Sequence, residues 1–341
     1  MGRRRGVRRC LTKAPKGTRW YGAKKKGRQQ KGVTPDSPIR EQEEDGFRGF
    51  ETSGPMQGDR PLLNCISLFD GISAAYVALT ALGIRVGQYF TSEICEPCRR
   101  VQERHVPFGV QLGCIEQLTE DVLDSIQVPI HLCIGGSPCA SLSRVNPARQ
   151  GLHSGTGKLF FDFIRVKNYL LRRAEREGYP FYWCFENTKH LDAAVLSEMN
   201  RHLRESPVAV CSSEFSAMKR PRYFWGNLKS LSTPRVPGKC CLVLDDFLDH
   251  GRTALVKTLG TLTTNQESQR GPGGQLPVSE RGVPSYLSIT EIERLFGFPA
   301  HYTDTGLTSN STRRAILGRS FCVPVVKVLL EELRLVFQIN E

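Results

Sequence analysis

A cysteine that directly follows an expected buried strand is the residue best placed for nucleophilic chemistry in this sequence. The apolar run Ile130 to Ile134 predicts a short strand, and it continues through Gly-Gly-Ser-Pro into Cys139. Ligands of an open α/β sheet bind outside the carboxyl ends of its strands. Many cysteines are only small buried hydrophobes, but at such a strand end a thiolate can attack a ligand. We therefore take Cys139 as the candidate nucleophile.

Acidic and basic groups fall at the ends of later expected strands. The run Phe181 to Phe185 predicts a strand that ends at Glu186, and Arg220 and Arg222 flank a proline where another strand begins. Nearby arginines lower the pKa of a thiol, and a carboxyl group can hold a ring nitrogen and deliver a proton. This set suits attack on an electron-poor ring that must then react at a second position. The predicted catalytic residues are Cys139, Glu186, Arg220 and Arg222.

A turn between the first strand and the first helix has the form of a nucleotide-type site. The strand Cys65 to Phe69 ends in Asp70-Gly71, and an apolar helix is expected from Ser73 to Leu82. A glycine turn lets a ligand approach the backbone N–H groups of the helix N-terminus. The next strand, Val86 to Thr91, leads to Glu93, 23 residues after Asp70. An acid at about this spacing binds ribose hydroxyls in dinucleotide folds, and the same logic serves any adenosyl ligand.

The elements that must position these groups alternate between strand and helix. Further strands are expected at 108–112, 208–215 and 222–225, and helices at 116–126 and 159–173. This alternation predicts an α/β fold with a doubly wound, mostly parallel, seven-stranded Rossmann-like sheet. From Ser230 to Pro284, Pro, Gly, Ser and Thr dominate and predict a small irregular subdomain. Helical patterns return at 290–296 and 323–337.

The net charge of +13 is concentrated at the N-terminus. Residues 1–31 contain 13 Lys or Arg and no acid, so the remainder is formally neutral. Such a tail binds polyanions without reading sequence, and Lys24 to Arg28 could be a nuclear import signal. The alternative is a disordered arm that only increases solubility. Residues 1–60 contain too little apolar surface to offset the entropy of ordering.

Cysteine usage and hydropathy exclude several classes of protein. The twelve cysteines include one C-x-x-C, Cys95 to Cys98, with no second pair at zinc-finger spacing. Structural zinc needs four ligands, so we expect no metal site. No apolar run approaches the ~18 residues of a membrane span, and no apolar segment follows the basic N-terminus. We therefore expect a soluble, intracellular protein with reduced thiols and no membrane partner.

These motifs, in their order along the chain, resemble the C5-cytosine DNA methyltransferases. Pro138-Cys139, Glu186-Asn187 and Arg220-x-Arg222 resemble three catalytic motifs of that family. Residues 67–71 resemble its first motif and 317–320 its last. Longer stretches at 135–157, 159–161, 222–227 and 296–299 are similar to the eukaryotic, animal-type de novo branch. The resemblance covers residues 63–337 and implies a de novo DNA (cytosine-5)-methyltransferase that uses S-adenosyl-L-methionine.

The resemblance assigns the cofactor pocket to the first strand ends and the C-terminal motif. Asp70 to Ala74 would line the methionine end, Glu93 would bind the ribose, and Cys95 would border the adenine. The expected cofactor-binding residues are Phe69, Asp70, Gly71, Ile72, Ser73, Ala74, Glu93, Ile94, Cys95, Cys114, Ile115, Arg319, Ser320 and Phe321.

The resemblance also assigns the catalytic roles. Cys139 would attack C6 of a flipped cytosine, while Glu186 holds N3 and the exocyclic amine. Arg222 would hold O2, and Arg220 would support the loop. Val145 would fill the vacated position in the base stack. The expected DNA-binding residues are Ser143, Val145, Asn146, Pro147, Thr264 and Asn265.

Double-stranded DNA and a second methyltransferase chain are the implied partners, and the nucleus the implied location. Phe160 and Phe161 lie where the family forms an oligomer interface, although Phe160 could equally be core. A second contact is expected around Asp304 and Arg313, where Asn310 replaces a usual arginine. The implied organisation is a basic tail (1–60), a catalytic core (61–229), a target-recognition subdomain (230–287) and a C-terminal return to the core (288–341).

Two positions depart from the family pattern and keep alternatives open. Cys114 stands where a carboxylate usually accepts from the adenine amine, so cofactor affinity is in question. Asn265 stands where a basic side chain usually reads the guanine after the target cytosine. Arg270 in the same loop could restore that contact. One alternative is a non-catalytic paralogue that binds DNA or stimulates a relative. The other is an RNA methyltransferase, although the Cys-Phe-Thr tripeptide of that branch is absent.

Overall fold

The computed structural model describes residues 60–144, 146–232 and 242–340. The expectations for the basic tail, its cluster Lys24 to Arg28, and Val145 lie outside these residues. Within them, no helix combines the length and the apolar character needed to cross a bilayer.

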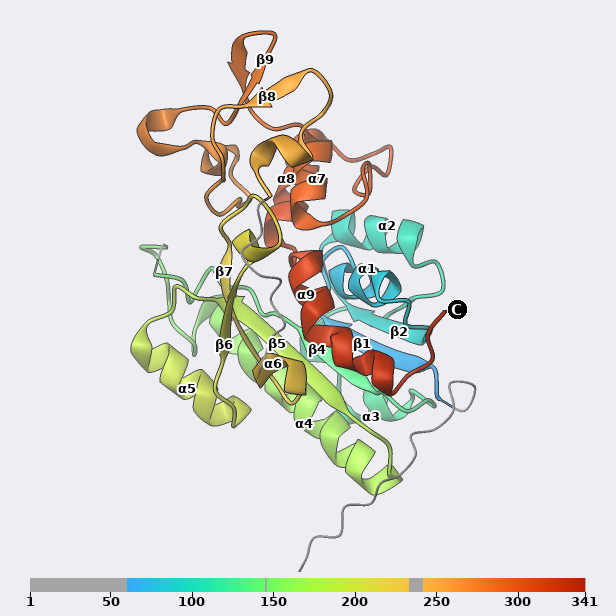
Figure 1. Cartoon of the computed structure of the whole chain (residues 1–341). Coiled ribbons are helices and arrows are strands. Elements are labelled where there is room, and N and C mark those ends of the chain that lie inside the picture. The colour runs from blue at the N-terminus through green and yellow to red at the C-terminus, as the bar shows by residue number, and fades with distance from the viewer. Residues whose placement is uncertain (1–59, 145, 233–241, 341) are drawn as a thin grey trace, which may run out of the picture. The chain divides into compact units, whose positions relative to one another are not determined.

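A seven-stranded sheet forms the centre of the fold (Figure 1). Its order is β3-β2-β1-β4-β5-β7-β6. All neighbours pair in parallel except β7, which is antiparallel to both β5 and β6. The strands are β1 (Leu63–Leu68), β2 (Val86–Ser92), β3 (Val110–Gln111), β4 (Leu132–Gly135), β5 (Tyr182–Thr188), β6 (Val208–Cys211) and β7 (Pro221–Gly226). This topology confirms the predicted α/β fold class.

Helices cover both faces of this sheet. The α-helices are α1 (Ala74–Ala81), α2 (Glu96–His105), α3 (Glu120–Asp124), α4 (Leu159–Glu177), α5 (Ala193–Leu203), α6 (Lys229–Ser232), α7 (Ile289–Phe296), α8 (Asn310–Arg319) and α9 (Val323–Leu330). Short 3-10 helices are η2 (Ile115–Gln117), η3 (Gly155–Lys158), η4 (Ser212–Glu214), η5 (Leu244–Phe247), η6 (Gln266–Gln269), η7 (Pro272–Gly274) and η8 (Glu331–Leu335).

The side chains of β1 show how the sheet joins two apolar layers. Leu63 and Cys65 belong to the cluster formed with α1 and α9, which lie side by side (Figure 1). Ile66 and Leu68 point the other way, into the cluster formed with α3, α4 and α5. Successive side chains of a strand point to opposite faces, and all six residues of β1 are buried. β1 is therefore buried on both faces, although Asn64 and Ser67 within it are polar.

The segment after α6 contains more regular structure than its composition predicts. A three-stranded antiparallel sheet is formed by β8 (Arg252–Ala254), β9 (Val278–Glu280) and β10 (Val283–Ser285), seen in orange at the top of Figure 1. The β9–β10 hairpin closes through Arg281 and Gly282, both with positive φ, at 52° and 83°. Two-residue hairpin loops of this kind need positive φ at both positions. The small irregular subdomain that the sequence predicts therefore also contains a short three-stranded sheet.

Several element boundaries also differ from the predicted ones. Strand β5 continues through Glu186 to Thr188, so Glu186 lies within the strand instead of after it. The expected helix at 116–126 is split into η2 and α3, because Thr119 caps a new helix by accepting from the Val122 N–H at 3.3 Å. The amphipathic end of the chain forms α9 followed by η8.

Candidate active site

Cys139 lies in the loop after β4, and its sulfur is influenced by the other three predicted catalytic residues. Burial and the charge of Glu186 raise the pKa of the Cys139 thiol, while the charges of Arg222 and Arg220 lower it. The Cys139 carbonyl accepts from the N–H groups of Leu142 and Ser143 at 3.0 and 2.9 Å. The thiol is therefore half-buried on a tightly turned loop, and its ionisation depends on one acid and two cations.

Glu186 and Arg222 form an ion pair across two adjacent strands. The Arg222 Nε lies 2.6 Å from the Glu186 Oε1, and the side chains are only 13% and 14% exposed. Arg222 pairs in register with Thr188, so the two charged residues are diagonal neighbours on one face of the antiparallel pair. A β-carbon on Gly136 would meet the Glu186 Oε2 at 2.8 Å and the Phe321 ring at 2.9 Å. The glycine after β4 therefore leaves room for the carboxylate.

Arg220 has a different position and a different set of partners. Its side chain is buried and donates to the carbonyls of Leu262, Gly318 and Ser320 at 3.0, 3.1 and 2.9 Å. The guanidinium also lies 5.2 Å from the ring centre of Phe296. Arg220 therefore connects β7 to the segment before η6 and to the end of α8. This geometry is that of a positioning residue.

The loop after Cys139 contains the expected DNA-contacting residues. The Asn146 Nδ2 donates to the Ala140 carbonyl at 2.6 Å, and its Oδ1 accepts from the Ala148 N–H at 3.0 Å. Pro147 is exposed, and Ser143 is half-buried. The Arg149–Asp192 ion pair, 3.0 Å long, ties the loop to the start of α5. Asn146 thus shapes the loop internally, and Pro147 reaches its surface.

The turn between β1 and α1 is built around a buried carboxylate. Asp70 accepts from the Tyr89 hydroxyl at 2.7 Å, the Ser73 hydroxyl at 2.8 Å and the Gln102 Nε2 at 2.8 Å. Burial raises the pKa of Asp70 to about 6, against the opposing effect of hydrogen bonds from Ser67, Tyr89 and Ser73. Phe69 and Ser73 have positive φ, at 56° and 59°, which costs of order 1–3 kcal/mol for each non-glycine residue. Strain held by a buried network is common at ligand sites.

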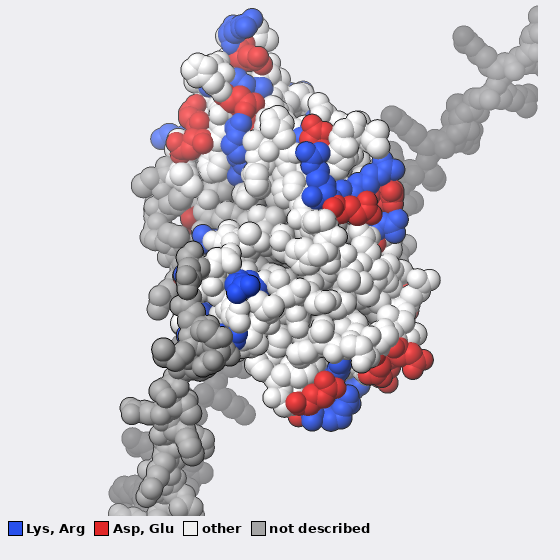
Figure 2. Space-filling model, turned by 90° about the vertical axis from the view of Figure 1, so that its right-hand side faces the viewer, with Lys and Arg blue, Asp and Glu red and all other residues white. Residues whose placement is uncertain are grey.

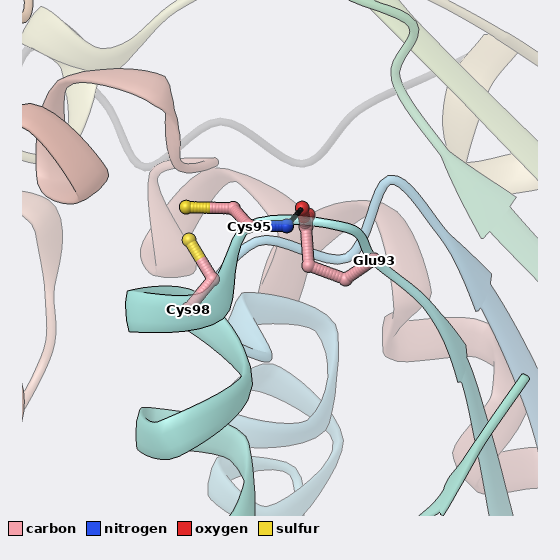
Figure 3. A group of neighbouring side chains, drawn as sticks. All are labelled: Glu93, Cys95 and Cys98. Atoms are coloured by element: carbon pink, nitrogen blue, oxygen red, sulfur yellow. Dashed lines mark hydrogen bonds between the residues drawn. The ribbon is translucent and has the colours of Figure 1, made fainter. Parts of the chain in front are cut away.

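The end of β2 is joined to that turn by Glu93. Its carboxylate accepts from the Gly71 N–H at 2.8 Å and from the Cys95 N–H at 2.7 Å (Figure 3 shows the second bond). Ile94 beside it is 72% exposed. A hydrogen bond from Cys98 lowers the pKa of Cys95 to about 6, and the charge of Arg319 acts in the same direction. The β1 turn, the β2 end and the C-terminal motif therefore meet at one place.

The segment after β3 completes this side of the sheet. The Ser92 hydroxyl donates to the Gly113 carbonyl at 2.8 Å, and Cys114 is half-buried, with its sulfur 3.6 Å from the Glu116 Oε2. A β-carbon on Gly71 or Gly113 would meet nothing within 4 Å. These features fit an adenosyl ligand. The space at the two glycines is open, Ile94 offers an exposed apolar surface, and the oriented Glu93 carboxylate can accept from ribose hydroxyls.

Several expected cofactor residues point inward instead of into this space. Their side chains are at most 5% exposed: Asp70, Ile72, Ser73, Ala74, Ile115 and Ser320. Any contact that they make with a ligand must therefore use the backbone. Phe69, Gly71, Glu93, Cys95 and Phe321 are half-buried, and Arg319 is exposed.

The expected interface residues are divided by their burial. Phe160 is fully buried, with its ring 5.5 Å from that of Phe185, so it is core, which is one of the two alternatives that the sequence left open for this residue. Phe161 is half-buried and stacks on His153 at 5.1 Å. Arg313 is also buried, and it donates to Glu293 at 3.1 Å and Thr303 at 2.9 Å. Its guanidinium is thus used inside the fold, whereas Asp304 is half-buried, as Phe161 is.

Two of the predicted DNA-reading residues lie in the segment that packs on α8. Thr264 and Asn265 are exposed. The Asn265 Oδ1 accepts from the Glu267 N–H at 3.0 Å and caps η6. A β-carbon on Gly318 would lie 2.4 to 2.7 Å from the backbone of Thr263 and Thr264. Sequence reasoning missed this role of Gly318, and it missed Gln102, because no pattern in the sequence predicted α2 or the approach of the two segments.

Comparisons with known proteins found similar sequences. Residues 63–206 match the family model described as C-5 cytosine-specific DNA methylase. Among curated proteins, the chain is 31% identical over 114 residues to DNA (cytosine-5)-methyltransferase DRM2 of Arabidopsis thaliana, which covers 30% of this chain and 18% of that protein. It is 30% identical over 117 residues to DRM2 of Oryza sativa subsp. japonica, covering 32% and 20%. The matches thus span about a fifth of the length of these relatives.

Solved structures share the fold over most of the described chain. A mutant DNMT2 of Spodoptera frugiperda superposes with a TM-score of 0.60 at 16% identity, covering 79% of this chain and 98% of that one. A putative DNA modification methyltransferase from an E. coli prophage superposes with a TM-score of 0.57 at 14% identity, covering 80% and 99%. At these identities the likeness shows the fold alone.

Proposed function

We propose that the chain is a de novo DNA (cytosine-5)-methyltransferase, and the match of residues 63–206 to the C-5 cytosine-specific DNA methylase model supports this proposal. It would transfer a methyl group to C5 of a flipped cytosine through a covalent adduct with Cys139. The longer motif stretches support the animal-type branch within the family. The observation that carries the proposal is the Glu186–Arg222 ion pair, 2.6 Å long. The charges of both residues act on the pKa of the Cys139 thiol.

The three groups divide the work on the base. The Cys139 thiolate adds to C6, which moves electron density toward C5 and N3 of the ring. Glu186, a carboxylate in the ion pair with Arg222, takes up a proton as the base binds, then donates to N3 and stabilises that charge, and Arg222 donates to O2. After C5 has been methylated, loss of the C5 proton restores the double bond and expels Cys139. The paired Arg222 holds the Glu186 carboxyl in place before the base arrives.

S-adenosylmethionine is the methyl donor of this family, and it supplies an electrophilic methyl group on a sulfonium. In this chain, Glu93 would hold the ribose hydroxyls, and exposed Ile94 would cover one face of the adenine. The strained turn at Phe69 and Gly71 would present its backbone to the methionine end. Cys114 offers only a weak acceptor to the adenine amine. We therefore expect weaker cofactor binding than a carboxylate at that position would give.

Double-stranded DNA is the proposed substrate. The basic N-terminal tail would provide most of the electrostatic attraction between the protein and the DNA. The sequence outside residues 1–31 is formally neutral. On the face in Figure 2, basic and acidic side chains lie side by side at the top, on one flank and at the bottom, and the white area between them carries a small basic group left of centre. Arg99 and Arg100, for example, both pair with Glu96. A nuclear location and pairing with a second methyltransferase chain complete the proposal.

A methyl-transfer assay tests the proposal directly. Tritiated methyl transfer is measured to unmethylated duplex DNA, hemimethylated duplex DNA and tRNA. We expect incorporation into both DNA substrates and none into tRNA, and a denaturation-resistant adduct with DNA containing 5-fluorocytosine, because the C5 fluorine cannot be eliminated. Transfer to tRNA alone would instead establish an RNA methyltransferase. Stimulation of an active homologue without transfer of its own would establish the regulatory paralogue.

A further inference from the structure

The start of α2 brings two sulfur atoms and a carboxylate together outside the proposed catalytic set. Cys95 caps the helix, and Cys98 follows one turn later. The two sulfurs and a carboxylate oxygen of Glu93 all lie within 4.8 Å of one another. Figure 3 shows both sulfurs on the same side of the β2–α2 connection. Among the described residues, no other group of three such ligands converges in this way.

Tetrahedral zinc at its usual bond lengths places its donor atoms about 3.6 to 3.8 Å apart. The distances between the three atoms therefore need to shorten by at most about 1 Å. Small rotations of the side chains are enough for this change. The C-x-x-C spacing places its sulfurs on one turn of α2, and Cys98 is only 2% exposed, so its position is fixed by packing. Cys95 and Glu93 are half-buried, so a metal ion can reach the site from solvent.

The carboxylate is already oriented for such a role. One Glu93 oxygen accepts from the Gly71 N–H and the other from the Cys95 N–H. Carboxylates that ligate metals are typically hydrogen-bonded by outer partners that fix their orientation. Each carboxylate oxygen has a second lone pair, so the two backbone bonds leave room for a metal ion.

We infer that Glu93, Cys95 and Cys98 form a binding site for a thiophilic divalent cation such as zinc. Three protein ligands leave a fourth position open, as in zinc sites that exchange a ligand. This cation also competes with S-adenosylmethionine, because both need the Glu93 carboxylate. The competition rests on the proposed function. Zinc would thus inhibit methyl transfer by occupying the cofactor pocket.

Cobalt is the probe for the site, since a thiolate–cobalt bond gives a charge-transfer absorbance that zinc removes. The full chain, kept reduced with a phosphine, is titrated with Co²⁺ and then with Zn²⁺ in the absence of DNA. Mutation of a residue that only hydrogen-bonds to a metal ligand typically lowers the affinity for the metal 10- to 100-fold. Loss of a direct ligand should therefore lower the affinity for cobalt at least about tenfold. We expect that loss in Cys98→Ser and in Cys95→Ser. The matched control is Cys211→Ser, because Cys211 is a half-buried cysteine on β6, outside the cluster.

The outcomes separate this inference from the proposed function. Equal cobalt binding by the wild type and by both cluster variants would overturn the metal site, whatever the methyl-transfer activity. For the competition, binding of the cofactor itself is measured by calorimetry with and without Zn²⁺. We expect zinc to weaken cofactor binding in the wild type and not in Cys98→Ser. Coupling between two ligands is reciprocal, so the cofactor must also displace cobalt, and failure of both effects would overturn the overlap.

Discussion

The Arg222 guanidinium and the Glu186 carboxylate lie 2.6 Å apart on neighbouring antiparallel strands, beside the loop that holds Cys139. This relationship gives the acid two opposing effects on the nucleophile. Directly, the negative charge of Glu186 raises the pKa of Cys139. Indirectly, Glu186 neutralises the arginine that lowers that pKa.

The first prediction concerns the ionisation of Cys139. In Glu186→Gln the negative charge is lost and Arg222 is unpaired, so the pKa of the Cys139 thiol should fall. The pH at which iodoacetamide half-modifies Cys139, followed by mass spectrometry, should move to a lower value. Glu116→Gln, at an exposed position, is the control and should leave it unchanged. An unchanged or higher midpoint in Glu186→Gln would show that Glu186 does not act on the thiol.

Much of this site could be predicted because strand ends carry their own signals. An apolar run followed by Gly-Gly-Ser-Pro-Cys placed Cys139 in the loop after β4, and the run before Glu186 indicated β5. The predicted topology is confirmed by the sheet. What these signals share is locality: each lies within a few residues of the group that it positions.

The burial of individual side chains could not be predicted in the same way. Phe160 and Phe161 are adjacent and chemically identical, but Phe160 is fully buried, whereas Phe161 is half-buried at the edge of the same core. Arg313 is charged and yet buried, because Glu293, 20 positions earlier, compensates its charge at 3.1 Å. Such placements depend on partners that are distant in sequence, and a single sequence gives no information about them.

A second prediction tests the contact between α8 and the segment before η6. In Gly318→Ala the new methyl group would lie 2.4 Å from the Thr263 carbonyl carbon, a backbone atom. The segment must move, which should lower the free energy of unfolding by about 1–3 kcal/mol in urea titrations. It should also change the preference for the base after the target cytosine. Gly260→Ala is the matched control, since its β-carbon meets nothing within 4 Å. Equal stability of the two variants would contradict the contact.

The third prediction concerns the pH dependence of stability. The folded pKa of Asp70 is about 6 because of burial, against about 3.9 for an ordinary aspartate. Asp70 therefore contributes stability that is complete below pH 4 and is lost as pH rises through 6. The difference corresponds to about 3 kcal/mol. In urea unfolding from pH 4 to 8, Asp70→Asn should lack this decline. The exposed Asp121→Asn should keep it, and a decline of equal size in Asp70→Asn would refute the assignment.

The fourth prediction concerns the half-buried aromatic on α4. If Phe161 anchors a second chain, Phe161→Ala should lower the sedimentation coefficient and reduce methyl transfer, because aromatic anchors dominate interface energies. Its stacking on His153 is also lost, so His153→Ala is made in parallel. An unchanged sedimentation coefficient in Phe161→Ala would remove this face as an interface.

The fifth prediction concerns the base read by Asn265. Its amide carries a paired donor and acceptor, which fit the N6 and N7 of adenine better than the two acceptors of guanine. A good bidentate pair discriminates by about 1–3 kcal/mol, or roughly five- to a hundredfold. The wild type should therefore show a relaxed requirement for guanine after the target cytosine.

Arg270 is poorly placed to restore that contact. It donates to the Glu267 carboxylate at 2.6 Å, to the Gly274 carbonyl at 2.8 Å and to the Tyr286 hydroxyl at 2.6 Å. Reaching a base would break these bonds. Asn265→Arg should thus increase methylation at CpG relative to CpA, measured by bisulfite sequencing of a mixed-context duplex. Because the substitution also removes the cap on η6, worth about 1 kcal/mol, Asn265→Ala controls for the loss of the cap alone. If the wild type already methylates CpG far above CpA, and Asn265→Arg changes nothing, another residue reads that base.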